Sequence, residues 1–425
     1  MIRLNRKKLD QEDPSQYKKG GYHPVEIGDM FENRYLVIKK LGWGVFSTVW
    51  LCRDEVQETY VALKISKSSR TYTDSASSEI AILQTINEKL QDFESGFVLS
   101  PKAYLVTLLD SFSHRGPNGR HVCMVFEILG INLLQVLKIY NFEGLPIEIC
   151  KSFFTQILTS LDFLHRTCGI IHTDLKLENI LLKLTPIQLS ELHQHGNVYT
   201  SIRRRVEKIE EIPKLFGRTF SKISVEKFSN NKAENLNNEL PKKLKEDEVF
   251  FNPKLEIKIV DFGNSVLSST SCNNEIQTRE YRAPEVILGY RYSCSTDIWS
   301  FGCIAFEMLT GEELFTPSQG EGYSEDDDHL AAIWELLGEF PLEWAKGSLR
   351  AWKFFLNDQL RNINQLEFYP LRRVLVERHG FKAGLADEIC RFLLPCLQIL
   401  PENRITAQAC LNNHWLASGR IFLSK

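Results

Sequence analysis

Five short motifs that follow one another in a fixed order constrain this chain more than any other feature of its sequence. Each motif places glycine or ionisable residues beside an apolar run, where a turn or a strand end would expose them. Taken alone each is weak, because a glycine pair between strands is usually a plain turn and a strand lysine is usually an exposed side chain. In chain order they lie at residues 41–49 (LGWGVFSTV), 61–64 (VALK), 171–179 (IHTDLKLEN), 259–263 (IVDFG) and 281–285 (YRAPE).

Together and in this order, the five motifs resemble the signature set of protein kinases: a glycine-rich loop, a strand lysine, a catalytic loop, Asp-Phe-Gly and Ala-Pro-Glu. The resemblance spans residues 35–418 apart from one insertion. It implies a bilobal α+β fold, in which an N-terminal arm (1–34) precedes a small β-rich N-lobe (35–129) and a large α-helical C-lobe (130–425). It also implies phosphoryl transfer from ATP, with Mg²⁺ as the metal.

The hydrophobic pattern agrees with this order of lobes. Short runs rich in Val, Ile, Leu and aromatic residues predict strands at residues 35–41, 48–53, 60–65 and 122–128. Apolar residues at helical spacing predict helices at residues 77–90, 147–165, 297–309, 329–337 and 387–400. A β-rich region is therefore followed by a helical one.

Residues 184–254 stand apart from both lobes, and we expect them to form a spacer insertion of low order in the C-lobe. They contain 13 Lys or Arg and 10 Asp or Glu residues with weak hydrophobic periodicity. Such a composition is typical of disordered or loosely helical segments. The insertion explains why Asn179 and Asp261 are 82 positions apart.

In the N-lobe, the kinase resemblance assigns residues to nucleotide binding. Gly42 and Gly44 let the backbone approach a phosphate closely, because no Cβ intervenes. Lys64 is expected to hold the α- and β-phosphates and to be oriented by an ion pair with Glu79 on the following helix. An apolar pocket for adenine is expected, with Glu127 and Leu129 offering backbone hydrogen bonds. Its apolar residues are Leu41, Val49, Ala62, Phe126 and Leu181.

In the C-lobe, the same resemblance assigns the reacting groups. Asp174 is expected to accept the proton of the substrate hydroxyl, and Lys176 to neutralise the phosphoryl group during transfer. Asn179 and Asp261 offer oxygen ligands of the kind that Mg²⁺ prefers. Thr278 matches the residue that hydrogen-bonds the catalytic Asp and Lys in serine/threonine kinases, which favours serine or threonine as the acceptor.

Three further residues are expected to support the site structurally. Asp297, at the start of an apolar helix, matches the residue that braces the catalytic loop from beneath. Glu285 and Arg404 match the ion pair of kinase C-lobes.

Longer segments resemble one family within the kinases, the SR-protein-specific kinases. The matching segments are residues 20–24 (GGYHP), 41–50 (LGWGVFSTVW), 121–130 (HVCMVFEILG), 169–174 (GIIHTD), 276–282 (IQTREYR) and 326–329 (DDDH). A spacer that splits the kinase core is also this family's pattern. The resemblance implies a serine/threonine kinase that phosphorylates serines in Arg/Ser-rich proteins such as splicing factors.

One residue of the catalytic loop bears on regulation. Thr173 stands between His172 and Asp174, where most regulated kinases have an Arg that pairs with a phosphorylated activation-loop residue. Because Thr173 carries no charge, a phosphate on residues 268–271 would find no partner there. We therefore expect a kinase that is active without phosphorylation of its activation loop.

Acidic residues are concentrated in one part of the chain. The net charge is −3, which excludes a domain that binds polyphosphate through bulk positive charge. Between Arg291 and Lys346, however, 54 residues include twelve Asp or Glu and no Lys or Arg. SR-protein kinases carry an acidic docking groove for arginine-rich substrates, and by residue match Glu312, Asp328 and Glu335 fall in it. A solvated acidic loop is the alternative interpretation.

Two other functions stay open at the level of sequence. The first is another serine/threonine kinase of the larger group that includes cyclin-dependent and MAP kinases, with a different substrate context. The second is a pseudokinase scaffold that binds partners without turnover. The second is disfavoured because the chain has all the residues needed for catalysis, namely Lys64, Glu79, Asp174, Asn179 and Asp261.

The remaining composition bears on the compartment and the partners. Ten cysteines are scattered without a Cys-x-x-Cys pair, and no apolar run reaches the ~18 residues of a membrane span. The charged first twenty residues lack the pattern of a secretory signal. We therefore expect an intracellular monomer, cytoplasmic, nuclear or both, that acts on proteins and contacts neither membrane nor nucleic acid directly.

Overall fold

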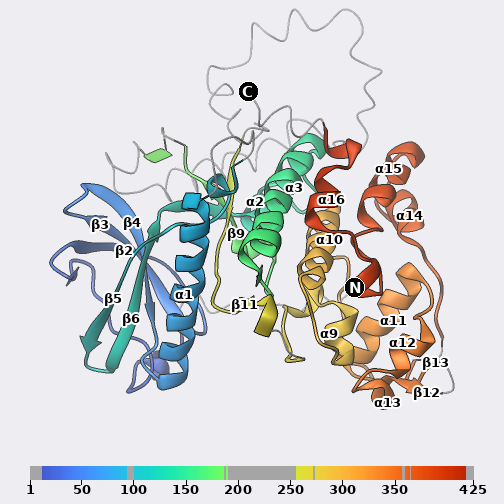
Figure 1. Cartoon of the computed structure of the whole chain (residues 1–425), viewed down its shortest axis with the longest axis horizontal. Coiled ribbons are helices and arrows are strands. Elements are labelled where there is room, and N and C mark those ends of the chain that lie inside the picture. The colour runs from blue at the N-terminus through green and yellow to red at the C-terminus, as the bar shows by residue number, and fades with distance from the viewer. Residues whose placement is uncertain are drawn as a thin grey trace, which may run out of the picture.

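The structure is a computed structural model that describes residues 12–92, 100–185, 188–189, 255–270, 273–356, 359–363 and 365–417. Within them, a β-rich N-lobe lies beside a helical C-lobe (Figure 1), so the predicted bilobal α+β fold is confirmed. The spacer predicted at residues 184–254 lies almost entirely outside the described residues.

An antiparallel sheet of six strands forms the N-lobe. In spatial order its strands are β1 (Met30–Phe31), β2 (Tyr35–Trp43), β3 (Ser47–Asp54), β4 (Thr59–Ser66), β6 (Gly119–Glu127) and β5 (Leu108–Gly116). Helix α1 (Arg70–Asp92) packs on this sheet (Figure 1). The helix presents one buried stripe to the sheet, because Ala76, Glu79, Leu83 and Ile86 recur at intervals of three or four residues.

Two features of the N-lobe differ from the sequence prediction. Helix α1 begins at Arg70, whereas the sequence predicts a start at residue 77. The prediction misses the first two turns because they are polar and show no apolar spacing. Strand β5 was not predicted at all. It is an edge strand whose side chains are only partly buried, so it lacks the clear alternation of a half-buried strand.

Part of the predicted N-terminal arm packs on the N-lobe. Strand β1 pairs with the start of β2, with Phe31 opposite Tyr35. Further upstream, Tyr22 and His23 are buried. The His23 ring lies 4.6 Å from that of His114 on β5, between ring centroids. The described part of the arm therefore belongs to the N-lobe surface.

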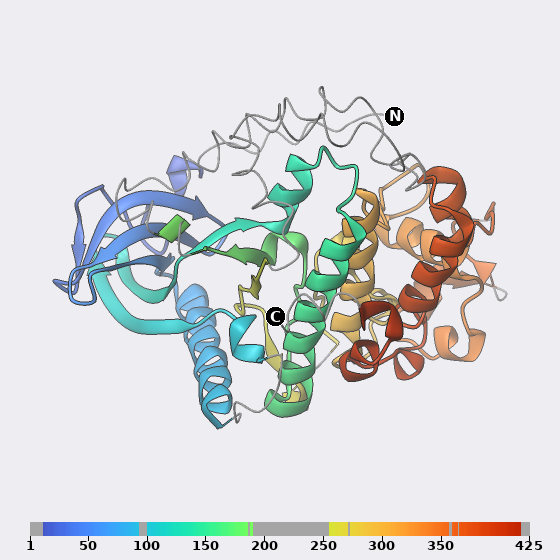
Figure 2. The ribbon, with the colours of Figure 1, turned by 90° about the horizontal axis from the view of Figure 1, so that it is seen from above.

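Two almost completely buried helices, α3 (Ile147–Asp162) and α10 (Ser295–Thr310), form the centre of the C-lobe (Figure 2). Phe154 of α3 packs edge-on against Phe301 of α10, with ring centroids 5.7 Å apart. The other α-helices that the structure describes in this lobe are α2 (Leu133–Ile139), α9 (Pro284–Leu288), α11 (Glu325–Leu337), α12 (Leu342–Lys346), α13 (Ala351–Phe354), α14 (Leu371–Arg373), α15 (Ala383–Leu393) and α16 (Ala407–Leu411).

The last of the predicted helices is shorter than expected. It was predicted to continue to residue 400, but α15 ends at Leu393. Pro395 follows at once, and proline lacks the amide hydrogen and clashes with the preceding helical turn. Among the helices that the structure describes, none is both long and apolar enough to cross a lipid bilayer.

Short strand pairs at the junction of the lobes position the candidate site. One small sheet contains β7 (Leu129–Asn132), β9 (Ile180–Lys183) and β10 (Ile257–Ile259), and another contains β8 (Ile170–Ile171) and β11 (Val266–Leu267). A third pair, β12 (Phe355–Leu356) with β13 (Gln359–Leu360), lies elsewhere in the C-lobe. Because Ile180 pairs with Ile259, Asn179 lies beside Val260, whose amide donates to the Asn179 carbonyl at 2.9 Å. The catalytic loop is thus joined to the Asp-Phe-Gly segment.

Candidate active site

Asp174 lies at the centre of a hydrogen-bonded group on the catalytic loop. Its Oδ2 accepts a hydrogen bond from Lys176 Nζ at 2.9 Å, and its Oδ1 accepts one from Thr278 Oγ1 at 2.7 Å. Lys176 Nζ also donates to Thr278 Oγ1 at 2.9 Å, which closes the triangle. The side chain of Asn179 donates to the Asp174 backbone carbonyl at 2.9 Å. The structure therefore brings together four residues that the sequence assigned to the C-lobe site.

The backbone of this loop is fixed from below by Asp297, a fully buried residue in the first turn of α10. Its carboxylate accepts hydrogen bonds from the backbone amides of His172 and Thr173, at 2.8 and 2.9 Å. His165 Nε2 lies 2.9 Å from the same carboxylate. Burial alone would raise the pKa of Asp297, but these hydrogen bonds and the nearby histidines hold it below the usual value. Asp297 is thus an ionised brace.

His165 contacts the candidate site although no sequence motif includes it. It lies in the wide helical turn Phe163–Cys168 that continues α3, and its contact with Asp297 joins positions 132 apart in the sequence. A single histidine among apolar residues carries no local signal of such a contact. Its role could be found only once the partner helix had been placed.

The uncharged Thr173 connects the catalytic loop to the segment after Asp-Phe-Gly. Its backbone φ is 67°, an unusual conformation for a β-branched residue, and its side chain is buried. Thr173 Oγ1 donates to the backbone carbonyl of Asn264 at 2.8 Å. Ser265 Oγ donates back to the carbonyl of His172 at 3.2 Å. Direct hydrogen bonds therefore join the catalytic loop to the segment after Asp-Phe-Gly. In most regulated kinases, an Arg at the position of Thr173 would instead pair with a phosphorylated residue.

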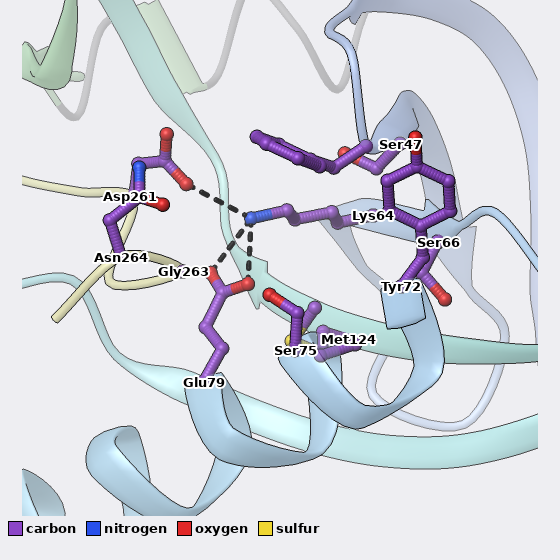
Figure 3. A pocket seen from close by; sticks show the side chains of 12 residues that line it. Ser47, Lys64, Ser66, Tyr72, Ser75, Glu79, Met124, Asp261, Gly263 and Asn264 are labelled. Atoms are coloured by element: carbon purple, nitrogen blue, oxygen red, sulfur yellow. Dashed lines mark hydrogen bonds and ion pairs between the residues drawn. The ribbon is translucent and has the colours of Figure 1, made fainter. Parts of the chain in front are cut away.

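On the other side of the cleft, Lys64 forms ion pairs with two carboxylates (Figure 3). Its Nζ lies 2.7 and 2.9 Å from the carboxylate oxygens of Glu79 and 3.2 Å from Oδ1 of Asp261. The positive charge of Lys64 lowers the pKa of Asp261, whereas burial raises the pKa of Glu79. Residues from β4, α1 and the loop after β10 thus meet at one point, and the predicted ion pair of Lys64 with Glu79 is present.

A pocket opens beside this group, between α1 and the glycine-rich loop (Figure 3). Its walls include Ser47 of the loop, Tyr72 and Ser75 of the first turns of α1, and Asn264. Lys64 and Asp261 also line the pocket. Because the exposed fraction of the Asp261 side chain is 43%, its carboxylate is accessible to a ligand.

Packing within the chain does not explain the two glycines of the loop. A Cβ added to Gly42 or Gly44 would meet no protein atom within 4 Å, and neither residue has a positive φ. The space beside both glycines lets the phosphates of a ligand approach the backbone closely. This observation fits ATP.

The donor set also fits Mg²⁺. Asp261 offers a carboxylate and Asn179 an amide oxygen, and Mg²⁺ usually takes one or two such protein ligands together with phosphate oxygens. Among the described residues, no group of three or more His, Cys, Asp and Glu side chains could hold a metal ion by itself. The protein thus offers the partial metal site that is usual when a nucleotide completes the coordination.

The residues assigned to the adenine pocket share one feature, partial exposure in an otherwise buried sheet. Val49 lies opposite Lys64 and Ala62 opposite Phe126 in the strand register, while their neighbour Leu63 is buried. Apolar side chains that stay partly open at a cleft suit a flat apolar ligand. The partly exposed members are Leu41, Val49, Ala62, Phe126 and Leu181, whereas Leu129 is buried.

The side chain of Glu127 is engaged within the protein. Its Oε1 accepts a hydrogen bond from the Thr107 amide at 2.9 Å and pairs with Lys258 Nζ at 2.6 Å. Contacts from this residue to a nucleotide therefore fall to its backbone, which is the role that the sequence assigned to it.

The predicted ion pair of the C-lobe is present. Arg404 binds Glu285 in a bidentate manner, with N–O distances of 2.7 and 2.8 Å, and both side chains are fully buried. Arg404 Nη1 also donates to the backbone carbonyl of Ser295 at 2.9 Å, at the start of α10. The pair therefore joins the Ala-Pro-Glu segment to the helix that carries Asp297.

The three residues assigned to docking come from two elements, and each contacts a different partner. Asp328 and Glu335 lie seven residues apart on the same face of α11, where they accept backbone hydrogen bonds from Ser318 and Glu367 at 2.8 and 3.1 Å. Glu312 lies on the exposed loop after α10 and pairs with Arg378 at 2.5 Å. Each carboxylate therefore already has a partner within the chain.

Known proteins resemble this chain over nearly its whole length. A model of the protein kinase domain matches residues 35–192 and 242–416. The serine/threonine-protein kinase SRPK of Physarum polycephalum is 40% identical, over 97% of this chain and 93% of that protein. Protein kinase dsk1 of Schizosaccharomyces pombe is 37% identical (96% and 85%), and SRSF protein kinase 3 of Homo sapiens is 33% identical (96% and 90%).

The similarity includes both lobes, and the family model is interrupted where the spacer was predicted. The residues that the kinase signature requires also meet in the structure, from Lys64 with Glu79 on one side of the cleft to Asp174 with Lys176 on the other. The chain therefore belongs to the protein kinases and, within them, to the family of SR-protein-specific kinases.

Proposed function

We propose that this chain phosphorylates serines in Arg/Ser-rich proteins, such as splicing factors, with ATP as the phosphoryl donor and Mg²⁺ as the metal. The observation that supports this best is the hydrogen-bonded triangle of Asp174, Lys176 and Thr278. One carboxylate oxygen of Asp174 accepts from Lys176 and the other from Thr278, and Lys176 also donates to Thr278. The substrate class is supported by the name of the human relative, SRSF protein kinase 3. We propose a monomer that acts in the cytoplasm, the nucleus or both.

In the proposed reaction, Asp174 accepts the proton of the serine hydroxyl while the serine oxygen forms a bond to the γ-phosphorus of ATP. The bond from that phosphorus to the β–γ bridging oxygen breaks, which leaves ADP. Lys176 lies close enough to Asp174 to balance the charge of the phosphoryl group, while Lys64 holds the other phosphates. Mg²⁺, held by Asn179 and Asp261, would neutralise negative charge on the phosphate oxygens.

Activity without phosphorylation of the activation loop is part of this proposal. The side chain of Gln277 donates to the Thr296 carbonyl at 3.1 Å and to Ser300 Oγ at 2.8 Å, and it accepts from the Ala283 amide at 2.9 Å. Arg282 is paired with Glu275 at 2.6 Å. These contacts, with that of Thr173, hold the described parts of the activation segment, residues 261–270 and 273–285, and so support activity without added charge.

The most direct test is phosphorylation of an Arg-Ser repeat peptide, followed by mapping of the modified residues. The enzyme is made in bacteria and treated with phosphatase, so that any activity is independent of another kinase. Peptides with Lys-Ser repeats and with Ser-Pro sites are matched controls, because lysine keeps the charge but lacks the guanidinium fork. A preference for Ser-Pro would contradict the substrate, and inactivity before treatment with a second kinase would contradict constitutive activity.

We also propose that Glu312, Asp328 and Glu335 attract the arginines of the substrate. Exposed ion pairs contribute only about 0.2–1 kcal/mol each, so several must act together. Because salt screens exposed charges beyond ~8–10 Å, the KM for an Arg-Ser peptide should rise steeply with ionic strength. A KM that does not change with salt would argue against an electrostatic groove.

A pair of triple variants separates docking from the general acidic field. Glu312→Gln with Asp328→Asn and Glu335→Gln should raise the peptide KM several-fold. The control triple replaces three exposed acids of the same region by glutamine, and so removes the same charge; these are Glu321, Glu339 and Glu343. Equal effects of the two triples would assign the attraction to the whole region rather than to the three residues.

A further inference from the structure

A tyrosine of the N-terminal arm holds the glycine-rich loop. Tyr22 Oη donates a hydrogen bond to the backbone carbonyl of Gly44 at 2.6 Å, and Tyr22 itself is only 2% exposed. The loop tip next to Gly44 is open, because the exposed fractions of Val45 and Phe46 are 63% and 51%. A buried hydroxyl thus anchors a segment with little other burial. We use the name strap for residues 12–23, which lead up to and include this contact.

Lys67 connects the strap to both the loop and helix α1. Its backbone amide donates to the carbonyl of Phe46 at 2.9 Å, while its ammonium group donates to Gln16 Oε1 of the strap at 3.1 Å. The same ammonium lies 4.4 Å from the ring centroid of Tyr22 and 5.2 Å from that of Tyr72 on α1. Lys67 is buried and is therefore not a freely rotating surface lysine.

The backbone of the strap is itself fixed to the chain between β4 and α1. The amides of Ser68 and Ser69 donate to the carbonyls of Gly21 and Gly20, at 3.1 and 2.9 Å. At the other end of the strap, Glu12 pairs with Lys40 of β2, the strand that leads into the glycine-rich loop. The strap thus contacts the loop, the strand before it and the residues that lead into α1.

Helix α1 is joined to the loop from its own side as well. The ring of Phe46 packs edge-on against Tyr72, with centroids 5.7 Å apart, and Tyr72 and Ser47 both line the pocket (Figure 3). Tyr72 belongs to the first turns of α1, which lie beyond the predicted helix. The loop, the helix that carries Glu79 and the strap therefore form one connected group around the phosphate end of the cleft.

From these contacts we propose that the strap positions the glycine-rich loop over the nucleotide, with Tyr22 as the positioning residue. The loop binds phosphates through its backbone, so the position of the Gly44 carbonyl fixes the orientation of neighbouring amides. Release of that carbonyl lets the open loop tip sample other positions, and binding of ATP must then restore the productive one. This inference requires only kinase activity and does not depend on the peptide substrate.

The test is Tyr22→Phe, which removes one hydroxyl and leaves the ring beside Lys67. Tyr35→Phe is the matched control: Tyr35 is also buried in the N-lobe, and its hydroxyl donates to Asp110 at 2.6 Å, but it lies at the opposite end of β2 from the loop. We expect Tyr22→Phe to raise the KM for ATP about 2- to 10-fold, the effect of one hydrogen bond, with the peptide KM unchanged. Tyr35→Phe should leave the KM for ATP unchanged.

A second measurement, amide hydrogen exchange without nucleotide, reports on the loop itself. Exchange in residues 42–47 should be faster in Tyr22→Phe than in the wild type or in Tyr35→Phe. Lys67→Met, which removes the cation between the two tyrosines, should give the same two changes. A wild-type KM for ATP in Tyr22→Phe, equal changes in Tyr35→Phe, or unchanged exchange in the loop would each overturn the proposal.

Discussion

The catalytic loop and the glycine-rich loop face the same cleft but are held in opposite ways. Asp297, which is fully buried, fixes the catalytic loop through two backbone amides, and Asp174 is itself buried. The glycine-rich loop has an exposed tip and is tied mainly through Tyr22 and Lys67. A proton acceptor must keep its place to a fraction of an ångström, whereas a loop over the nucleotide must open to release ADP. The difference in burial matches the difference in task.

The largest expected effect is on the rigid side. Asp174→Ala should lower kcat by about 10²–10⁴-fold, because it removes the group that we propose as the proton acceptor. The affinity for nucleotide should stay nearly unchanged, since the side chain contacts Lys176, Thr278 and Asn179 rather than the glycine-rich loop. Initial rates and titration with a fluorescent ATP analogue measure the two quantities. Near wild-type turnover would show that another group accepts the proton.

The buried ion pair of Arg404 with Glu285, which contacts the start of the helix that carries Asp297, can be removed without changing a residue of the cleft. Arg404→Leu leaves the fully buried carboxylate of Glu285 without its main partner and should destabilise the protein by about 3–5 kcal/mol. Urea unfolding followed by circular dichroism gives the change. The double variant Glu285→Met with Arg404→Leu removes both charges and should recover much of the loss. A mild effect of the single variant would mean that the C-lobe does not depend on this pair.

Glu79→Gln tests the nucleotide side of the cleft, where Glu79 of α1 pairs with Lys64. The change weakens a charge-assisted hydrogen bond to Lys64, so kcat/KM for ATP should fall about 10- to 100-fold. Because the ion pair lies on the nucleotide side of the cleft, the KM for peptide should stay the same. Steady-state kinetics with each substrate varied in turn separates the two. An equal rise in both KM values would indicate general damage to the N-lobe.

The smallest expected effect concerns Glu307, a buried acid near the C-terminal end of α10. Burial raises its pKa to about 8, and Tyr281 Oη donates to its carboxyl group at 2.7 Å. Since the folded-state pKa is raised above the ordinary 4.5, the associated stability is complete at low pH and is lost as the pH rises through about 8. As the pH rises from 6 to 9, the free energy of unfolding of Glu307→Gln should therefore increase by about 1–3 kcal/mol relative to that of the wild type.

Thermal unfolding across this pH range measures the difference. The exposed Glu339→Gln is the control, and its stability should follow that of the wild type at every pH. A Glu307→Gln variant that shows the wild-type pH profile would mean that the carboxyl group is already ionised in the folded protein.

The sequence predicted which residues of the candidate site are brought together, because these residues lie in short motifs. Asp174, Lys64 and Asp261 sit in strings of residues whose spacing encodes a loop, a strand and a turn, so their meeting could be expected. Tyr22 lies in the GGYHP segment, which resembles the family but indicates no chemistry, and His165 lies in none of the motifs. Their partners, Gly44 and Asp297, were identified in the sequence but lie 22 and 132 positions away, and only the packing of whole elements brings each pair together.

The predicted docking residues illustrate a second limit. Charge density identified the acidic region, yet partners depend on where arginines elsewhere in the chain arrive. Arg378, which lies 66 positions from Glu312, already pairs with it, and no local pattern announces this contact. Likewise, the first turns of α1 are polar and owe their helical form to contacts such as that of Tyr72 with Phe46. Tertiary contacts override local propensity in both regions.

The hairpin of β9 and β10 has a consequence for how this family can diversify. The Lys183 amide donates to the Glu256 carbonyl at 2.8 Å, and their side chains pair at 2.6 Å, so the two ends of the intervening 72 residues, 184–255, are held together. The entropy of closing such a connection grows only with the logarithm of its length, about 0.6 kcal/mol for each doubling. Evolution can therefore lengthen, shorten or replace this segment almost independently of the enzyme around it.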